Sequence, residues 1–416
     1  MLDWPKKGGQ EWERAAAKYA ERIKAWPWSS LGLHFATTVY NTYALPVLAF
    51  TAQVARTSEH IKNLESHGLR RAAPGPGVWA TNADLWHLKH AFGMPRGFGS
   101  LEILGRAAKL RLATNDNRRE GGLQLGSRMA EIQAAARSLT FPARAGWLET
   151  WRNDSIPNVL EENRHDLIAR GIDGKDMLRE LASKLEATKP PGEASELARR
   201  RLQKAIRDRL QSASEYNTHD RIRSKLTRWN FEGLPRQVAD RFELNLKRAS
   251  KMIQPRVTAA VFGTAWNRWC TERRFQRRSS PCNFCKLGCG GAAEDSIEHY
   301  SRCKVLKECH ATEFGIKSSW LFPQWIGVHD DCKSDGGLVC GAVGAYASYR
   351  TTNAARHAGG MSAEAAKRAF HQAITEAVAG APRTAKLLRV RAQERAGDAA
   401  QPKRPRLTVR EAIALM

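Results

Sequence analysis

A short stretch near position 300 carries four side chains of the types that bind metal ions in proteins. Cys282 and Cys285 are separated by two residues, which lets two thiolates on one turn reach a single ion. His299 and Cys303 are separated by three residues, so on a helical turn both side chains face the same way. The order C-x2-C-x13-H-x3-C leaves no obvious open position and is typical of a tetrahedral site. We therefore expect these four residues to hold one structural Zn²⁺.

A third cysteine leaves the first ligand pair open. Cys285 and Cys289 could replace Cys282 and Cys285, although the earlier pair is the primary prediction. Cys309 and His310 follow shortly after the second pair and are further candidates. Cysteines without any metal are the remaining alternative.

Other chemistry of the same residues fits less well. An iron–sulfur site built from Cys282, Cys285, Cys289 and Cys303 would leave His299 without a role. The P-C-x-x-C order also occurs in zinc deaminases, but no H-x-E precedes it here. A thioredoxin-like motif would begin at a strand-to-helix junction, whereas this one follows a basic run. A cysteine nucleophile with a histidine base explains fewer of the ligand-type residues.

Charge predicts the kind of partner. The chain has 416 residues, a formal net charge of +25 and an isoelectric point near 10.1. A protein this basic gains free energy by displacing counterions from phosphates, so nucleic acid, RNA or DNA, is the expected partner. No apolar run is long enough to span a bilayer, so no membrane partner is expected. Clustered cysteines at ligand spacing favour a reducing compartment.

The positive charge is concentrated before the cysteines. Residues 199–280 contain 21 basic residues against 7 acidic residues, with tryptophan and phenylalanine interleaved. Basic side chains with aromatic rings that stack on bases are typical of nucleic-acid sites. The predicted contacts are Arg268, Trp269, Arg273, Arg274, Phe275, Arg277 and Arg278.

Apolar periodicity predicts helices at the start of the chain. Leu31–Val54 is dense enough in apolar residues for a buried helix, which Pro46 must kink or break. A second helix should start at Thr57 or Ser58 and stop before the Pro-Gly repeat that begins at Pro74.

A further helix should follow that break. Thr81 and Asp84 form a predicted capping box, and the helix should end at Gly93. Another helix should begin at Ser100. The fold class expected from these patterns is mostly α.

Two groups of segments resemble a known family. The segments YNTYALPVLAFTAQV, HIKNLESHGLRR and LWHLKHAFGMP look like the thumb that follows the palm in reverse transcriptases of non-LTR (LINE-type) retrotransposons. AWNRWCTERRFQRRSSPCNFC and DSIEHYSRC are similar to the basic approach and CCHC zinc knuckle that close such polymerases. The resemblance implies a thumb that grips template and primer, and a knuckle that engages RNA or target DNA.

The chain departs from this family in its acidic residues. Family members hold two Mg²⁺ ions with paired aspartates of the palm, in an aromatic-x-Asp-Asp motif that this sequence lacks. Asp330 and Asp331 lie beyond the knuckle, with no following Glu-x-Lys of the kind that an endonuclease of some relatives carries. They are expected to lie in a solvated acidic loop. Polymerase activity is not expected of this chain alone.

The sequence therefore predicts a palm-less nucleic-acid-binding protein. The alternatives are a zinc-stabilised protein-interaction module and a retroelement fragment without function. The predicted divisions are 1–115, a helical thumb-like domain; 116–198, a polar helical region; 199–280, the basic segment; 281–312, the knuckle; 313–392, a C-terminal helical cap; and 393–416, a basic flexible tail.

The tail contains a short basic cluster of the nuclear-import type. Its residues are Lys403, Arg404, Pro405 and Arg406. A nuclear location is therefore favoured over a cytoplasmic one.

Overall fold

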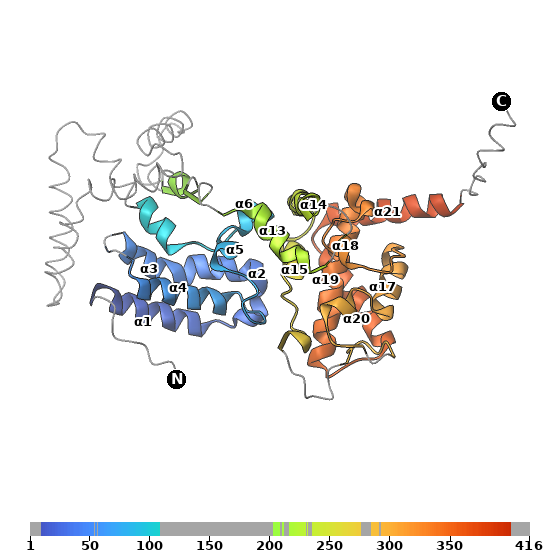
Figure 1. Cartoon of the computed structure of the whole chain (residues 1–416), viewed down its shortest axis with the longest axis horizontal. Helices are drawn as coiled ribbons and strands as arrows, with labels where there is room; N and C mark the ends of the chain where they lie inside the picture. The colour runs from blue at the N-terminus through green and yellow to red at the C-terminus, as the bar shows by residue number, and fades with distance from the viewer. Residues whose placement is uncertain are drawn as a thin grey trace, which may run out of the picture. The chain divides into compact units, whose positions relative to one another are not determined.

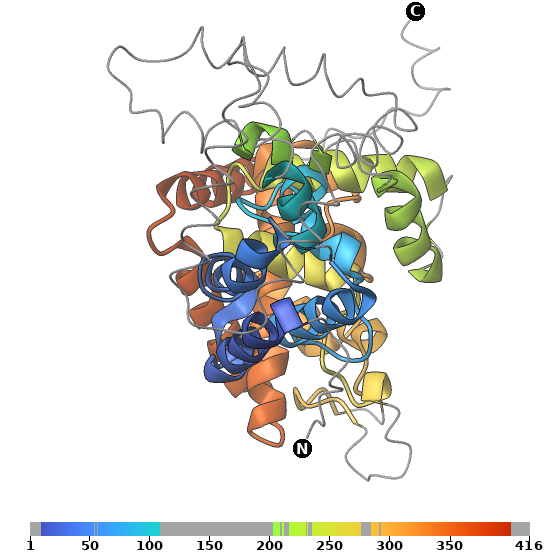
Figure 2. The ribbon, with the colours of Figure 1, turned by 90° about the vertical axis from the view of Figure 1, so that its left-hand side faces the viewer.

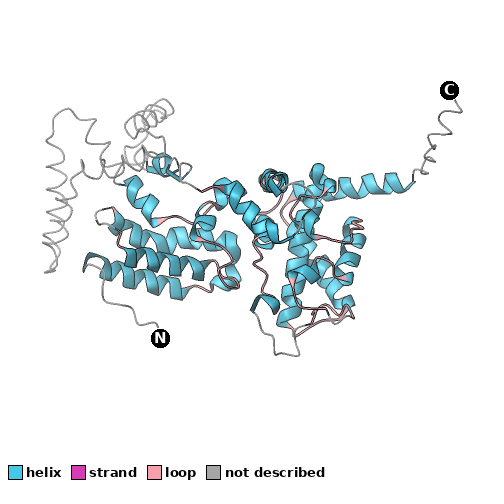
Figure 3. Ribbon diagram, viewed as in Figure 1, coloured by secondary structure: helices cyan, strands magenta, loops and turns pink. Residues whose placement is uncertain are grey.

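The chain folds into helices, as its apolar periodicity predicts. The computed structural model describes residues 10–53, 55, 57–108, 203–208, 210–211, 216–229, 231, 235–275, 284–290 and 293–400. Within these ranges, helices are joined by turns and loops, and the β pairing is confined to one isolated antiparallel bridge between Phe284 and Glu294 (Figure 3). The mostly α fold class is confirmed.

The chain divides into two compact units. Unit 1 comprises residues 1–74 and 80–218, and unit 2 comprises residues 75–79 and 219–416. The predicted knuckle and the predicted helical cap both belong to unit 2. The nuclear-import cluster and the whole of the predicted polar helical region, 116–198, lie outside the described residues.

Unit 1 is a bundle of helices drawn in blue and cyan in Figure 1. Its elements are α1 (Gln10–Ala25), α2 (Trp28–Val39), the π-helical turn η1 (Tyr40–Ala44), α3 (Leu45–Ala52), α4 (Glu59–Ala72), α5 (Asn82–Trp86) and α6 (Leu88–Phe92).

Helices α1, α3 and α4 lie side by side, and Figure 2 shows this packing with the helices nearly end on. Tyr19 and Tyr40 meet in the core, where one phenol donates to the other at 3.2 Å. Gly68 of α4 makes room for this pair, because a Cβ there would lie 1.9 Å from the Tyr19 Oη.

The predicted helix breaks of unit 1 are confirmed. Pro46 lies in the first turn of α3, directly after the π-helical turn that interrupts the long apolar stretch. Ser58 precedes the first residue of α4, and the helix ends two residues before Pro74. Pro46 and the Pro-Gly repeat therefore set the ends of these helices.

The helix after the break has a capping box, as predicted. Asp84 N–H donates to Thr81 Oγ1, and Thr81 N–H donates to the Asp84 carboxylate. Gly93 ends the segment in the left-handed conformation, with φ of 69°. The single predicted helix is instead two short helices, because His87 leaves helical geometry between α5 and α6.

Unit 2 is assembled around one long helix. Its elements are α13 (Thr218–Leu226), η2 (Thr227–Trp229), α14 (Pro235–Ala249), α15 (Pro255–Ala265), η3 (Arg273–Phe275), α16 (Ile297–Tyr300), α17 (Lys304–Phe314), α18 (Phe322–Trp325), η4 (Asp330–Lys333), α19 (Asp335–His357), α20 (Ala363–Val378) and α21 (Pro382–Ala400).

Helix α19 contacts α14, α15, α17, α18, α20 and α21 (Figure 1). Its small residues permit this crowding: a Cβ on Gly341 would lie 2.2 Å from the Gln324 carbonyl oxygen, and one on Gly344 would lie 2.3 Å from the His310 ring. Large side chains of the neighbouring helices, such as Trp325 and Phe370, fill the space around it.

The C-terminal boundary differs from the prediction. Helix α21 continues to Ala400, although a flexible tail was expected to begin at residue 393. Residues 391–400 include Arg, Ala, Gln and Glu, which are good helix formers, so the change to a polar composition does not end the helix.

Candidate metal centre

The first cysteine pair lies on a tight turn of the knuckle. Cys285 N–H donates to the Ala293 carbonyl at 2.8 Å, which brings the two arms of the turn together. Gly288 adopts a φ of 61°, in the left-handed region that favours glycine, so the chain can reverse between Cys285 and Cys289. A Cβ at Gly288 would also lie 3.0 Å from the carbonyl oxygen of Met361, on the α19–α20 connection.

The second pair lies at the ends of two helices. Ser296 caps the one-turn helix α16 by accepting a hydrogen bond from His299 N–H at 3.1 Å. Cys303 is buried at the N-cap position of α17. The short segment between the helices thus directs the imidazole and the thiol toward the cysteine turn.

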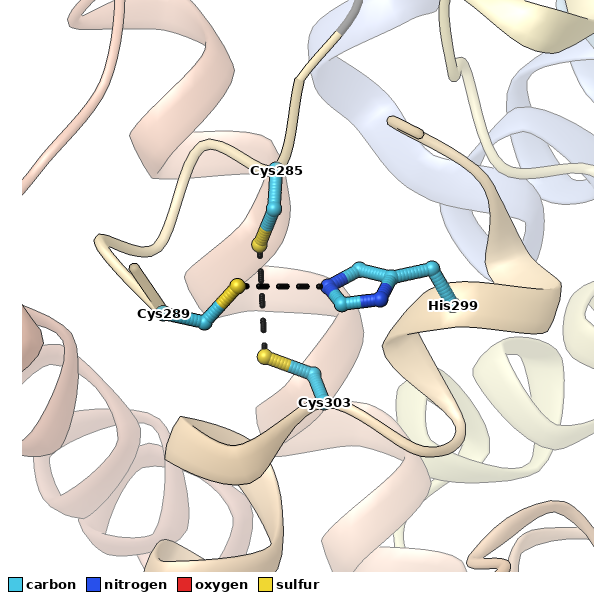
Figure 4. Close-up of side chains that lie close together, drawn as sticks. All are labelled: Cys285, Cys289, His299 and Cys303. Atoms are coloured by element: carbon cyan, nitrogen blue, oxygen red, sulfur yellow. Dashed lines mark hydrogen bonds between the residues drawn. The ribbon is translucent and has the colours of Figure 1, made fainter. Parts of the chain in front are cut away.

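Four ligand atoms surround one point. The ligand atoms of Cys285, Cys289, His299 and Cys303 all lie within 4.8 Å of one another. Figure 4 shows their side chains converging from separate backbone segments, with Sγ–Sγ 3.9 Å between Cys285 and Cys303 and Sγ–Nε2 3.6 Å between Cys289 and His299. A tetrahedron with metal–sulfur bonds of about 2.3 Å has ligand–ligand edges of about 3.8 Å. These residues could therefore hold a tetrahedrally bound metal ion.

The proton distribution also suits a metal. The Cys285 and Cys303 sulfur atoms are close enough to share a hydrogen bond, and this contact, together with His299, lowers the pKa of Cys303. Thiolates are the form of cysteine that binds metals.

A buried carboxylate anchors the knuckle to its surroundings. Asp295 is fully buried and accepts hydrogen bonds from the Tyr300 hydroxyl at 2.6 Å and from Glu272 N–H at 2.9 Å. Arg356 of α19 donates to the same carboxylate at 3.2 Å. Burial raises the pKa of Tyr300, and the Asp295 charge adds to this effect, so its hydroxyl remains a donor. Asp295 was not among the predicted site residues, and its position beside the metal motif was the one signal in the sequence that could have identified it.

The structure brings together the alternative ligand set. Cys289 completes the cluster with Cys285, His299 and Cys303, whereas Cys282 lies outside the described residues. The spacing in the observed cluster is C-x3-C-x9-H-x3-C.

The two further candidates take no part in this cluster. His310 is buried, accepts from Trp325 Nε1 at 3.1 Å and lies 3.0 Å from Ser348 Oγ. Burial raises the pKa of Cys309 to about 12, which disfavours the thiolate. Both residues contribute to the core of unit 2.

One of the predicted nucleic-acid contacts, Trp269, is in the core, and its neighbour Arg268 is partly exposed. The side chain of Trp269 is 2% exposed, and its ring stacks on that of Trp325 at 5.5 Å. The guanidinium of Arg268 lies 4.8 Å from the ring centre of Trp79, and partial burial lowers the pKa of this side chain. The prediction that Trp269 contacts nucleic acid is wrong for this structure, because its buried ring cannot reach a surface-bound ligand, whereas the contact through Arg268 stays a prediction.

Part of the basic run lies beside the knuckle, as predicted. Arg273 is exposed and pairs with Glu294 at 3.0 Å, while its backbone N–H donates to the Asp295 carbonyl. Phe275 is 46% exposed, and Arg274 precedes it on η3. Arg277 and Arg278 lie outside the described residues.

The acidic pair beyond the knuckle is exposed. Asp330 lies near Lys333 and Arg241, at 3.2 and 3.4 Å, and hydrogen bonding to Lys333 lowers its pKa. Asp331 lies 3.4 Å from His329. Among the described residues, the group with ligand atoms close enough to share a metal ion is the Cys₃His cluster.

Comparison with known proteins does not identify the class of this protein. The chain matches no protein-family model, and no curated protein and no solved structure is significantly similar to it. Within the described residues, no helix combines the length and apolarity needed to cross a membrane. The chain is thus a mostly helical protein with a Cys₃His group able to bind a metal.

Proposed function

We propose that Cys285, Cys289, His299 and Cys303 bind one structural Zn²⁺. Three sulfur ligands and one imidazole nitrogen suit zinc and leave no coordination position for a substrate. The bound ion would supply folding free energy to a loop that has little core of its own. Asp295 and Gly288 would hold the loop against the rest of unit 2 while the ion joins its two arms.

The chain's partner in this proposal is a nucleic acid. The observation that carries it is the net charge of +25, concentrated in a segment with 21 basic and 7 acidic residues that leads directly into the metal cluster. Arg273 is exposed at this junction, and its backbone is hydrogen bonded to the knuckle. A rigid knuckle would fix the path along which such side chains meet phosphates.

The resemblance to the C-terminal part of LINE-type reverse transcriptases supports the same proposal. Its thumb-like segments coincide with η1 and helices α3 to α6, and its knuckle segments contain Cys285, His299 and Cys303 of the Cys₃His cluster. We assign binding of RNA or DNA to this chain, without nucleotidyl transfer by the chain alone. Nuclear import through residues 403–406 belongs to the same proposal.

Two measurements test the proposal on the full chain. Elemental analysis should find one zinc per chain, and binding of a labelled oligonucleotide should weaken linearly on a log–log plot against salt. A folded, metal-free protein that is insensitive to chelators would exclude the zinc site. Absence of salt-dependent oligonucleotide binding would exclude the nucleic-acid function and favour a protein-interaction module.

A further inference from the structure

Four aromatic rings in unit 2 form a continuous stack. The centroids of Trp229 and Phe322 are 3.5 Å apart, those of Phe322 and Phe231 are 6.0 Å apart, and those of Phe231 and Trp320 are 5.3 Å apart. The angles between the ring planes are 18°, 28° and 27° in the same order. We call these four residues the aromatic ladder.

The ladder runs from the core to the surface. Phe322 is fully buried and Trp229 is 7% exposed, whereas Phe231 and Trp320 are partly exposed. A stack that served the core alone would have no need to continue into water, because the hydrophobic gain comes from rings removed from water. The outer rings keep part of their faces and edges accessible while the inner rings fix their orientation.

An arginine covers each end of the ladder. The guanidinium of Arg302 lies 5.5 Å from the ring centre of Trp320, and that of Arg228 lies 5.0 Å from the ring centre of Trp229. Arg228 also pairs with Glu298, which neutralises its charge. Arg302 is exposed, and no carboxylate of the described residues forms an ion pair with it. The outer end therefore carries a positive charge beside a flat ring.

Two further cations are close in sequence to Arg302 and Trp320. Lys304 begins α17 one residue after Cys303, and Lys317 lies three residues before Trp320. Both are exposed, and within the described part of the chain neither is paired with a carboxylate. A ligand that matches this surface combines a planar face with repeated negative charge.

We infer that the outer end of the aromatic ladder, Trp320 and Phe231 with Arg302, is a base-stacking site for single-stranded nucleic acid. The inference rests on the proposed nucleic-acid function and gives it a location. The exposed Arg302 can rotate away from Trp320 and let an unpaired base take its place, since guanidinium planes and aromatic rings both stack on bases. Its charge then remains beside the adjoining phosphate.

The metal cluster positions this site. Arg302 directly precedes the metal-site residue Cys303, and Leu321 N–H donates to the Ser301 carbonyl at 2.8 Å. This bond ties the residue after Trp320 to the residue before Arg302. Binding of the ion would therefore fix Arg302 and Trp320 relative to each other.

The test uses the full zinc-loaded chain and two labelled probes, a 12-nucleotide homopyrimidine single strand and a duplex of equal length. Trp320→Leu should weaken single-strand binding about 5- to 150-fold, the range for loss of one stacked base, and leave duplex binding unchanged. Trp320→Phe should restore most of the affinity because it keeps a stacking ring. Arg302→Gln should reduce the salt slope for the single strand by about 0.7.

The matched control is Trp26→Leu, which removes a partly exposed tryptophan of unit 1 that packs edge-on against Tyr43. It should leave single-strand binding unchanged. Zinc content and circular dichroism confirm that each variant is folded. A second readout is photocrosslinking of a 5-iodouracil strand to the unsubstituted chain, which should map to Trp320 or Phe231.

Salt-dependent binding of the single strand that Trp320→Leu does not weaken would overturn the stacking site and leave the proposed function intact. Crosslinks that map to neither Trp320 nor Phe231 would likewise refute the stacking site and not the proposed function. Failure of the unsubstituted chain to bind either probe would instead refute the nucleic-acid function itself.

Discussion

The Arg356 guanidinium donates to the Asp295 carboxylate with Nε 3.2 Å from Oδ2, and so joins the last turn of α19 to the knuckle. Asp295 is fully buried, and the Arg356 side chain is 17% exposed. The same carboxylate also accepts from Tyr300 and from the backbone of Glu272. One ion pair thus connects the metal loop, the basic segment and the central helix of unit 2.

Replacing Arg356 should loosen the knuckle. In Arg356→Ala the buried carboxylate loses its cation, a change that costs about 3 to 5 kcal/mol for a buried pair. We expect a lower free energy of unfolding and faster transfer of zinc to a colorimetric chelator. Both are measured on the purified chain, by urea unfolding and by the rate of the chelator reaction.

The control lies on the same helix. Arg350→Ala breaks a more exposed contact with Glu376, at 3.4 Å, and should change stability by at most about 1 kcal/mol. Equal zinc-transfer rates in the two variants would show that the Arg356–Asp295 pair does not hold the metal loop.

Single cysteine substitutions decide the ligand set. Cys289→Ser should abolish stoichiometric zinc binding, because it removes one of the four atoms that surround the site. Cys282→Ser should retain one zinc per chain. The measurement is zinc content by elemental analysis after dialysis against a weak chelator. The reverse result would assign Cys282 to the site in place of Cys289.

Local signals in the sequence were sufficient for the helix ends of unit 1. Pro46, the Thr81–Asp84 capping box and Gly93 each act through backbone geometry within a few residues. Their consequences are therefore independent of the rest of the fold. Local signals could not decide between Cys282 and Cys289, because both spacings allow a turn. The observed turn is held by contacts with residues distant in sequence, such as the close approach of Gly288 to Met361.

Burial of the aromatic residues was not predictable locally. Trp269 and Trp320 both lie near basic residues, but Trp269 packs against Trp325 and α19, while Trp320 is at the open end of the aromatic ladder. Which tryptophan reaches the surface depends on helices more than 50 residues away along the chain from Trp269, as its contact with Tyr349 shows. The composition of the sequence shows that positive charge lies near the knuckle, but tertiary packing determines which aromatic rings are exposed.

Glu65 should make unit 1 less stable at alkaline pH. It is 4% exposed, and burial raises its pKa to about 7 from an ordinary value of 4.5, although the Leu101 N–H bond opposes the shift. The pKa of Glu65 is higher in the folded chain than in the unfolded chain. The protonated carboxyl therefore makes its full contribution to the free energy of unfolding below pH 4.5, and this contribution is lost as the pH rises through 7. Glu65→Gln removes this titration and should gain about 2 to 3 kcal/mol relative to the unsubstituted chain between pH 5 and pH 8. Urea unfolding at both pH values measures the change, and a constant difference would contradict the shifted pKa.

His310 should have the opposite effect on unit 2. Burial lowers its pKa to about 3 from 6.5, so the folded chain keeps a neutral imidazole that the unfolded chain protonates. The pKa of His310 is lower in the folded chain than in the unfolded chain. The neutral imidazole therefore makes its full contribution to the free energy of unfolding above pH 6.5, and this contribution is lost as the pH falls toward 3. His310→Gln can still accept from Trp325 but does not titrate. Between pH 7.5 and pH 5, the unsubstituted chain should lose about 2 kcal/mol relative to this variant, as measured by urea unfolding.

Removal of zinc should impair single-strand binding more than duplex binding. The Leu321–Ser301 backbone bond and the adjacency of Arg302 to Cys303 make the outer ladder dependent on an ordered metal loop. Much of the basic surface is remote from it in sequence, including Arg223, Arg236 and Lys251, and is not expected to change. Chelation followed by titration with the two labelled probes should reproduce the loss caused by Trp320→Leu, and added zinc should restore binding. Chelation should not reduce the single-strand affinity of the Trp320→Leu variant any further, because this variant already lacks the stacking site that loss of zinc disrupts. An equal loss for both probes would show that zinc supports the whole of unit 2 and not this site in particular.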